Sequence, residues 1–312
     1  MIDGVSGVFE DKELIACDRT GSSFRNNLYV VWARFYSMNI MLCRSTDNGS
    51  TWSSPIRVDD SGCYQWPVCA VGSNGEVYVS WVNYSGIAFD RSSDGGSTFG
   101  ADILVSRTGV FGSLNGGIDV FSYPAIDVDI SSGPHRGSIY MAFMDWATFD
   151  TDIYFTKSSD RGNSWSSPVR INDDPVGNHC DQFHPWLFVD NNGEITVIWL
   201  DRRNDPANML MDCYMTRSTD GGLTWCPNKR LTSVSSNPTA GSKAGLLGEY
   251  IGLSGTAGRV NPLWTDTREG NQDAYTSVIN LDASDIKIFC KIGYALLIFI
   301  ISLSCTVAIL KI

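Results

Sequence analysis

The sequence predicts an all-β protein built from repeated four-stranded units, and two observations support this fold class. The pattern Ser-x-Asp-x-Gly-x-Thr/Ser-Trp/Phe occurs four times, at residues 45–52, 92–99, 158–165 and 218–225. Long helical periodicity is absent before residue 286, whereas short strand-like runs and 30 glycines punctuate the chain. A repeat of this kind can make one domain of a chain this long, with each copy marking the same point in its unit.

The four octets read as tight turns. Their Asp side chain accepts hydrogen bonds from nearby backbone N–H groups, and their Gly adopts a positive φ. A basic residue and a strand-like run precede each octet, and an aromatic residue closes it. We therefore interpret the octets as structural turns between the third and fourth strands of each unit, with the aromatic side chain packed into the unit.

Placing the octets at these turns assigns the strands in order, as a four-stranded meander in each unit. The first four units have runs at 13–17, 27–34, 40–43 and 55–58; 68–71, 76–81, 87–89 and 102–105; 124–128, 138–145, 152–155 and 168–171; 186–189, 194–201, 213–215 and about 229–231. A fifth unit, at 250–253, 260–266 and 274–278, has no octet and no clear fourth strand. We expect residues 5–9 to supply that strand and close a ring.

The bulk composition excludes some functions. A formal net charge of −11 and a pI of about 4.6 argue against nucleic acid as a partner, because phosphate binding needs a basic surface. No C-x-x-C pair occurs, so we expect no zinc site. We also expect no cofactor, whereas acidic loops such as Asp173-Asp174 leave calcium binding open. Among the nine cysteines, Cys63 with Cys69 and Cys213 with Cys226 either form disulfides or remain buried thiols.

The two ends of the chain differ from the repeats. Residues 292–310 form a nearly unbroken apolar stretch of 19 residues flanked by Lys287, Lys291 and Lys311, long enough to cross a bilayer. We divide the chain into a repeat domain, residues 1–283, and an apolar C-terminal segment, residues 284–312, expected to be a transmembrane helix. The alternatives are a buried helix or a non-native tail. Without a signal peptide at Met1, the anchor predicts an extracellular or cell-surface protein whose native start lies upstream.

Candidate functional residues cluster on the face opposite the octets. In a four-stranded meander, the loops between the second and third strands and between units lie on that face, which we call the open face. Charged residues and a tyrosine recur there: Arg34, Asp181, Asp201, Arg202, Glu249, Tyr250, Asp266 and Arg268. One interpretation is structural, with Asp201/Arg202 and Asp266/Arg268 as ion pairs that tie neighbouring units. The other is catalytic, with arginines binding a carboxylate and acidic residues transferring protons.

The octet resembles the Asp-box, or BNR repeat, of sialidases (neuraminidases), and residues 10–280 are similar to a sialidase-type β-propeller. The resemblance implies four-stranded blades, five visible here and six if an N-terminal blade is missing. It also implies a glycoside hydrolase that acts on terminal sialic acid or a related acidic sugar of glycoconjugates. The oligomeric state is not implied.

The same resemblance implies roles for the open-face residues. Tyr250 stands where the nucleophile is expected, with Glu249 as its activating carboxylate; Asp201, Asp181 or Asp266 is the acid. Arg34, Arg202 and Arg268 form the clamp on the sugar carboxylate. The Arg-Ile-Pro motif of sialidases is absent. The alternative is therefore a non-catalytic propeller that serves as a surface carbohydrate- or protein-binding module.

Overall fold

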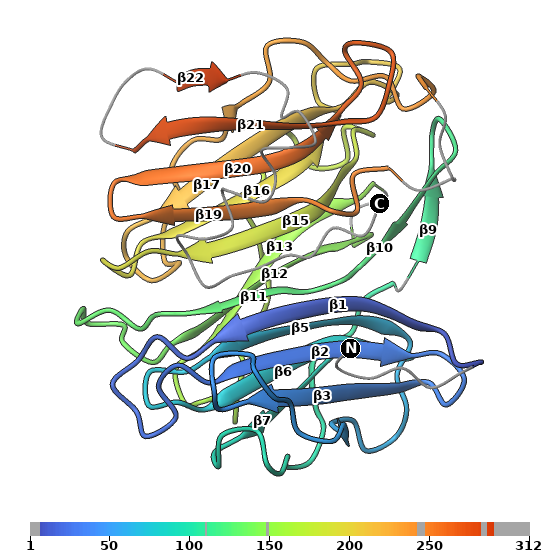
Figure 1. The fold of residues 1–312 in the computed structure, drawn as a ribbon. Helices are drawn as coiled ribbons and strands as arrows, with labels where there is room; N and C mark the ends of the chain where they lie inside the picture. Colours follow the sequence, from blue (N-terminus) through green and yellow to red (C-terminus); the bar gives the residue numbers. More distant parts are fainter. Residues whose placement is uncertain (1–6, 110, 148–149, 242–246, 282–285, 290–312) are drawn as a thin grey trace.

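The computed structural model describes residues 7–109, 111–147, 150–241, 247–281 and 286–289. These residues form strands and loops, with five four-stranded antiparallel sheets and one two-stranded hairpin (Figure 1). The all-β prediction is confirmed, and we call each four-stranded sheet a blade. No helix within the described ranges is long and apolar enough to span a membrane.

Each blade is a meander whose strands pair in chain order. The first blade comprises β1 (Glu10–Cys17), β2 (Leu28–Arg34), β3 (Asn39–Ser45) and β4 (Ile56–Arg57). The second comprises β5 (Gln65–Val71), β6 (Val77–Asn83), β7 (Gly86–Ser92) and β8 (Ile103–Ser106). The hairpin of β9 (Phe111–Leu114) and β10 (Ile118–Phe121) follows.

The remaining blades repeat this order. The third comprises β11 (Ala125–Val128), β12 (Ile139–Asp145), β13 (Asp152–Ser158) and β14 (Val169–Arg170). The fourth comprises β15 (Gln182–Val189), β16 (Ile195–Asp201), β17 (Asp212–Ser218) and β18 (Lys229–Arg230). The fifth comprises β19 (Gly252–Thr256), β20 (Arg259–Asp266), β21 (Asp273–Asn280) and β22 (Ile286–Phe289).

The fifth blade corrects one expectation. Its fourth strand is β22, which pairs antiparallel with β21, so residues 5–9 do not supply it. A short connection from β21 continues the meander at a smaller loop-closure cost than recruiting the distant N-terminus. Strand β22 begins inside the segment predicted as the apolar tail, and residues 290–312, which hold most of the predicted transmembrane helix, lie outside the described residues.

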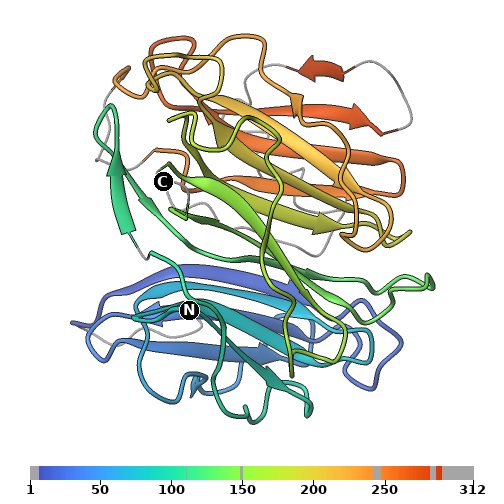
Figure 2. The ribbon, with the colours of Figure 1, turned by 180° about the vertical axis from the view of Figure 1, so that it is seen from behind.

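The blades follow one another through their first strands, with β1 beside β5, β5 beside β11, β11 beside β15 and β15 beside β19. Figures 1 and 2 show the first two blades in one half of the molecule, the last two in the other, and β11 between them. Apolar side chains fill the spaces between blades. Each of three core clusters holds buried rings from two or more blades: Tyr29 and Trp81, Phe89 and Phe143, and Trp199 and Trp264.

The octets form the predicted turns, and Asp220 illustrates their shared geometry. Its two carboxylate oxygens accept hydrogen bonds from the backbone N–H and hydroxyl of Thr224 at 2.9 and 2.5 Å, and Ser218 Oγ donates to it at 2.8 Å. Gly222 has φ +76°, and a Cβ there would collide with the Phe155 ring of the preceding blade. The glycine is therefore required by both the turn and the packing between blades.

The basic residue before each octet links its blade to the next one. It donates a hydrogen bond to a carbonyl in the following blade, which in three cases belongs to the fourth residue of the next octet. The pairs are Arg44 with Gly95 (2.9 Å), Arg91 with Arg161 (2.6 Å), Lys157 with Gly221 (2.7 Å) and Arg217 with Leu281 (3.5 Å).

Neither of the cysteine pairings is present. Cys63, Cys69, Cys213 and Cys226 each carry a thiol. Burial raises the pKa of Cys63 and of Cys69 to about 12, so both stay protonated at neutral pH.

Candidate functional site

Five residues occupy equivalent positions at the centre of the molecule, and we call them the axial residues. Each stands two places before the residue that resumes or begins pairing of the first strand with the second. They are Lys12, Trp66, Tyr123, His184 and Tyr250.

A β-bulge creates this position in three blades. In β1, β5 and β15 the pairing shifts near the start of the strand, so that two residues face one on the neighbouring strand. The bulged residues Lys12, Trp66 and His184 have positive φ angles of 59°, 58° and 51°. Such bulges re-aim side chains and are frequent beside active sites. Here they turn side chains toward the centre, at the ends of the strands that face away from the octets.

A central cavity of about 70 Å³ opens among these residues. Four axial residues line it, together with residues of β1, β5, β15 and β19. Its walls are largely aromatic, from Trp66, Tyr123, Trp186 and Tyr250, and its charged residues are Lys12, Glu13 and Glu249. A mostly apolar lining with a few convergent polar groups is typical of ligand sites, whereas the volume is smaller than their usual range of about 300–1,000 Å³.

An ion pair crosses the cavity. Lys12 Nζ lies 3.0 Å from Glu249 Oε2, and both side chains are about one-tenth exposed. The same ammonium lies 4.1 Å from the centre of the Tyr250 ring, a cation–π contact. The pair joins the first strand of the first blade to the start of the fifth blade.

The titratable neighbours of this pair are held in their neutral forms. His184 is fully buried and stacks on Tyr123 at 5.4 Å between ring centres. Burial and the charge of Lys12 lower the pKa of His184 to about 3, so its ring is uncharged at neutral pH. Burial and the negative charge of Glu249 raise the pKa of Tyr250 above its usual value. The Tyr250 hydroxyl therefore needs a base before it can act as a nucleophile.

The structure brings Glu249 and Tyr250 together at the cavity but does not assemble the predicted arginine clamp. Arg34 pairs with Glu10 at 2.8 Å. Arg202 is completely buried, and burial lowers its pKa to about 10. Neither these two arginines nor Arg268 is among the lining residues of the cavity. Each is already engaged by protein groups, which leaves no shared site for a substrate carboxylate.

Asp201 and Asp266 instead belong to a repeated structural corner with the sequence Trp-x-Asp-x-Arg. In each copy, the indole N–H and the arginine two residues after the aspartate donate hydrogen bonds to the carboxylate, and the guanidinium covers a tyrosine ring. The two sets are Trp199, Asp201, Arg203 and Tyr214, and Trp264, Asp266, Arg268 and Tyr275. Burial opposes ionisation of Asp266, but the hydrogen bonds from Arg268 and Trp264 hold its pKa below the usual value.

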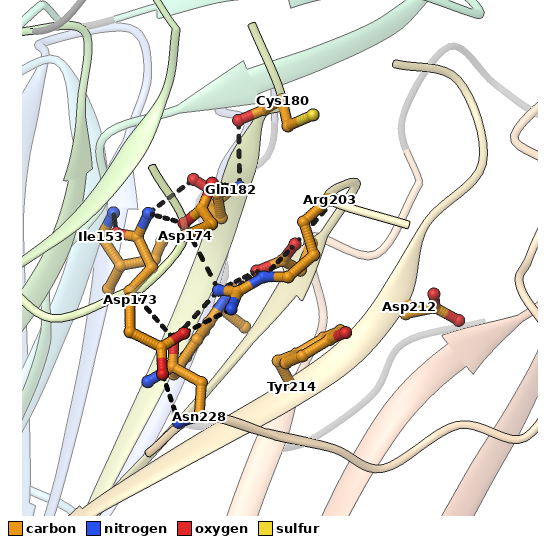
Figure 3. Close-up of polar contacts among 12 residues, drawn as sticks. Ile153, Asp173, Asp174, Cys180, Gln182, Arg203, Asp212, Tyr214 and Asn228 are labelled. Atoms are coloured by element: carbon orange, nitrogen blue, oxygen red, sulfur yellow. Dashed lines mark hydrogen bonds and ion pairs between the residues drawn. The ribbon is translucent and has the colours of Figure 1, made fainter. Parts of the chain in front are cut away.

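Arg203, rather than Arg202, ties neighbouring blades (Figure 3). Besides Asp201, its guanidinium contacts Asp173 at 2.5 Å, in the loop that follows β14 of the third blade, and Asn228 Oδ1 at 2.9 Å. The predicted interblade ion pair is therefore present with a different arginine. Sequence spacing alone does not distinguish the two, because they are adjacent and only the turn after β16 decides which one folds back onto Asp201.

Asp181 is likewise part of a buried network. It accepts hydrogen bonds from the backbone of Thr151 at 3.1 Å and from the Asn208 amide at 2.6 Å, and it lies 3.8 Å from Arg202. These contacts anchor the start of β15. They place Asp181, Asp201 and Asp266 away from the residues that line the cavity.

Sequence reasoning missed much of the cavity wall, including Lys12, Trp66, Tyr123 and Trp186. One signal was present: an aromatic or imidazole ring precedes proline at Trp66-Pro67, Tyr123-Pro124 and His184-Pro185. Proline lacks a backbone N–H and is tolerated at a free strand edge, and the first strand of each blade has its free edge toward the centre. The recurring ring–proline pair thus marks the axial position.

Comparisons with known proteins bear mainly on the fold. No family model matches the chain. The xyloglucanase Xgh74A of Acetivibrio thermocellus is 25% identical over 199 residues, which are 59% of this chain and 22% of that protein. The chain thus spans about a fifth of this curated relative.

Two solved structures share the arrangement of blades. An α-L-arabinanase of Penicillium chrysogenum, complexed with arabinobiose, has a TM-score of 0.53 at 15% identity, covering 89% of this chain and 95% of that one. The Hadza microbial sialidase Hz136 has a TM-score of 0.51 at 15% identity, covering 88% of this chain and 53% of that one. At such identities these likenesses show a propeller-like all-β fold and do not assign an activity.

Proposed function

We propose that this chain is a glycoside hydrolase of propeller type that binds a glycan in the central cavity. The observation that carries the proposal is the meeting of Glu249, Tyr250 and Lys12 in an aromatic-walled cavity opposite the octets. The xyloglucanase, the arabinanase and the sialidase that resemble this chain are, by name, all enzymes of glycans.

The residues of the cavity suggest how a glycan would react. The Tyr250 oxygen is the candidate nucleophile: as it bonds to the anomeric carbon, the glycosidic C–O bond breaks, and Glu249 takes the Tyr250 proton and passes it to the leaving oxygen. Water then cleaves the bond between the sugar and Tyr250, which restores the tyrosine hydroxyl. In the structure, Lys12 forms an ion pair with Glu249. A sugar hydroxyl or carboxylate that binds Lys12 would break this pair and free Glu249 to accept the proton of the Tyr250 hydroxyl. We place terminal sialic acid and related acidic sugars within the substrate range, because Lys12 offers them a cation. We also place the protein outside the cell or on its surface, where such glycans occur.

Hydrolysis of a substrate panel tests the proposal. The panel holds fluorogenic α-sialoside and α-L-arabinofuranoside together with xyloglucan, and the proteins are wild type, Glu249→Gln and Tyr250→Phe. We expect turnover of at least one substrate and its loss in both variants. Tyr36→Phe serves as the control, since Tyr36 is 88% exposed and does not line the cavity. Absence of turnover with every substrate, in a folded full-length chain, would refute a hydrolase.

A second candidate is a non-catalytic glycan-binding module. It is favoured by the ion pair that neutralises Glu249 and by the engagement of Arg34, Arg202 and Arg268 within the protein. Glycan binding that is lost in Trp66→Ala, in a chain with no turnover, would establish this alternative.

A further inference from the structure

We infer that a row of aromatic side chains on the open face extends the central cavity into a site for several consecutive sugars of one glycan chain. The inference rests on the proposed function and makes it more specific, since it assigns an oligosaccharide rather than a single terminal sugar as the ligand. We call this row the aromatic track, and its members are Tyr84, Tyr64, Trp66, Phe121 and Phe111.

The track is continuous with the cavity through Trp66, which lines the cavity wall. On one side, the Trp66 ring lies 4.1 Å from Phe121, which lies 5.8 Å from Phe111. On the other side, Trp66 stacks on Tyr64 at 5.8 Å, and Tyr64 meets Tyr84 edge-on at 5.8 Å. Trp66 itself is buried between Tyr64 and Phe121, so a ligand that extends beyond the cavity would meet the exposed end rings, Tyr84 and Phe111.

The β9–β10 hairpin carries its two phenylalanines on the face opposite the one that packs on the apolar core. One face, with Leu114, Ile118 and Val120, packs on the apolar core. The other face pairs Phe111 with Phe121 and, next along the hairpin, Ser113 with Asp119. Phe121 is partly buried against Trp66, so the exposed ring of Phe111 is the one that this face offers to a partner.

The ends of the track are open to solvent. Tyr84 is 70% exposed and Phe111 is 56% exposed. Ser113 donates a hydrogen bond to Asp119 beside the phenylalanine pair. Such a surface combines flat apolar rings with a hydroxyl and a carboxylate. It suits a sugar chain, because each sugar ring presents an apolar C–H face and a polar edge of hydroxyl groups.

The hairpin is held in place before any ligand binds. Arg202 donates a hydrogen bond of 2.8 Å to the Asn115 carbonyl at the hairpin tip. Gly112 lies against the Trp146 ring, where a Cβ would not fit. A preformed platform loses little conformational freedom on binding, which favours affinity.

Charge argues for a glycan over a membrane surface. Binding to anionic lipid requires clusters of lysine and arginine. The track holds none, its polar pair includes the carboxylate of Asp119, and the whole chain has a formal charge of −11.

Affinity as a function of glycan length tests the inference on the full chain. Titration calorimetry compares arabinobiose with arabinohexaose, and cellobiose with xyloglucan heptasaccharide. We expect the longer member of one pair to bind about tenfold more tightly, which corresponds to about 1.4 kcal/mol from the added aromatic contacts. Tyr84→Ala and Phe111→Ala should remove most of that gain and change disaccharide binding less than twofold. Tyr36→Ala is the matched control, in the corresponding turn of the first blade and outside the track.

The outcomes separate the two proposals. Disaccharide binding or hydrolysis that depends on Glu249, without any gain from length, overturns the track and leaves the proposed function standing. A gain from length that survives both track variants also overturns it. No binding of any of these glycans overturns the track, as does Phe111-dependent binding to anionic vesicles or self-association. The proposed function is overturned only if the hydrolysis panel, which includes the α-sialoside, also shows no turnover.

Discussion

Arg202 Nη2 donates a hydrogen bond of 2.8 Å to the carbonyl oxygen of Asn115, which places a fully buried guanidinium under the tip of the β9–β10 hairpin. Arg202 Nη1 donates to the Asn208 carbonyl at 3.0 Å, and the Phe183 ring lies below at 5.3 Å. The residue therefore fastens the hairpin to the fourth blade, and its role is structural.

We expect Arg202→Met to lower the free energy of unfolding by about 3–5 kcal/mol, because it leaves Asp181 as a buried charge that has lost its partner. Urea denaturation measures the change. The exposed Arg259 provides the control, and Arg259→Met should change stability by less than about 0.5 kcal/mol. An Arg202→Met protein of wild-type stability would contradict this role.

Arg268→Ala should reduce stability without weakening glycan binding. The variant removes two hydrogen bonds from the buried Asp266 and uncovers the Tyr275 ring, at a cost of about 1–3 kcal/mol. Denaturation and calorimetric titration of the same samples report the two effects separately. The equivalent Arg203→Ala should behave alike. Loss of glycan affinity at unchanged stability would instead show that Arg268 binds the substrate.

The lowered pKa of Asp160 predicts that the stability of the protein depends on pH. Hydrogen bonds from the side chain and backbone of Ser164, and from Ser158, lower the pKa of Asp160 to about 2. A carboxylate with a lowered pKa in the folded state stabilises the protein above its unfolded pKa near 4, and this stabilisation is lost as pH falls toward 2. Asp160→Asn should therefore flatten the fall of Tm over this range. An unchanged profile would show that the octet carboxylate does not couple to folding.

A comparison of two octet glycines, Gly49 and Gly162, distinguishes the cost of backbone strain from the cost of a packing clash. Gly49 and Gly162 have φ angles of +86° and +84°, but a Cβ on Gly49 would meet Leu28 at 3.4 Å, whereas one on Gly162 would collide with the Phe89 ring. We expect Gly49→Ala to cost about 1 kcal/mol, and Gly162→Ala to cost about 1–3 kcal/mol more. Equal losses in thermal denaturation would mean that the ring moves aside without cost.

Sequence reasoning was most successful where local chemistry dictates the structure. The hydrogen bonds of Asp220 and the positive φ of Gly222 depend on residues within one octet, so the turns and the strands around them were predictable. The open face followed from the meander, since the direction of each strand is determined by the turns.

The site was harder to predict because it depends on residues that are far apart in the chain. Lys12 and Glu249 meet only when the first and fifth blades come together. No local sequence pattern predicts a contact between residues 237 positions apart (249 minus 12). The residue types around Lys12 likewise do not predict the β-bulge that points its side chain toward the centre. Arg202 and Arg268 drew attention by charge alone, although the charges of both are satisfied inside the protein.

The cation before each octet always binds the next blade in chain order, so these contacts run from the N-terminus toward the C-terminus. Arg44, Arg91, Lys157 and Arg217 each bind a carbonyl of the following blade. Because a ribosome releases the chain from its N-terminus, every donor leaves the exit tunnel before the acceptor that it will bind. Each finished blade thus offers a charged docking point to the next, and assembly can proceed vectorially during translation.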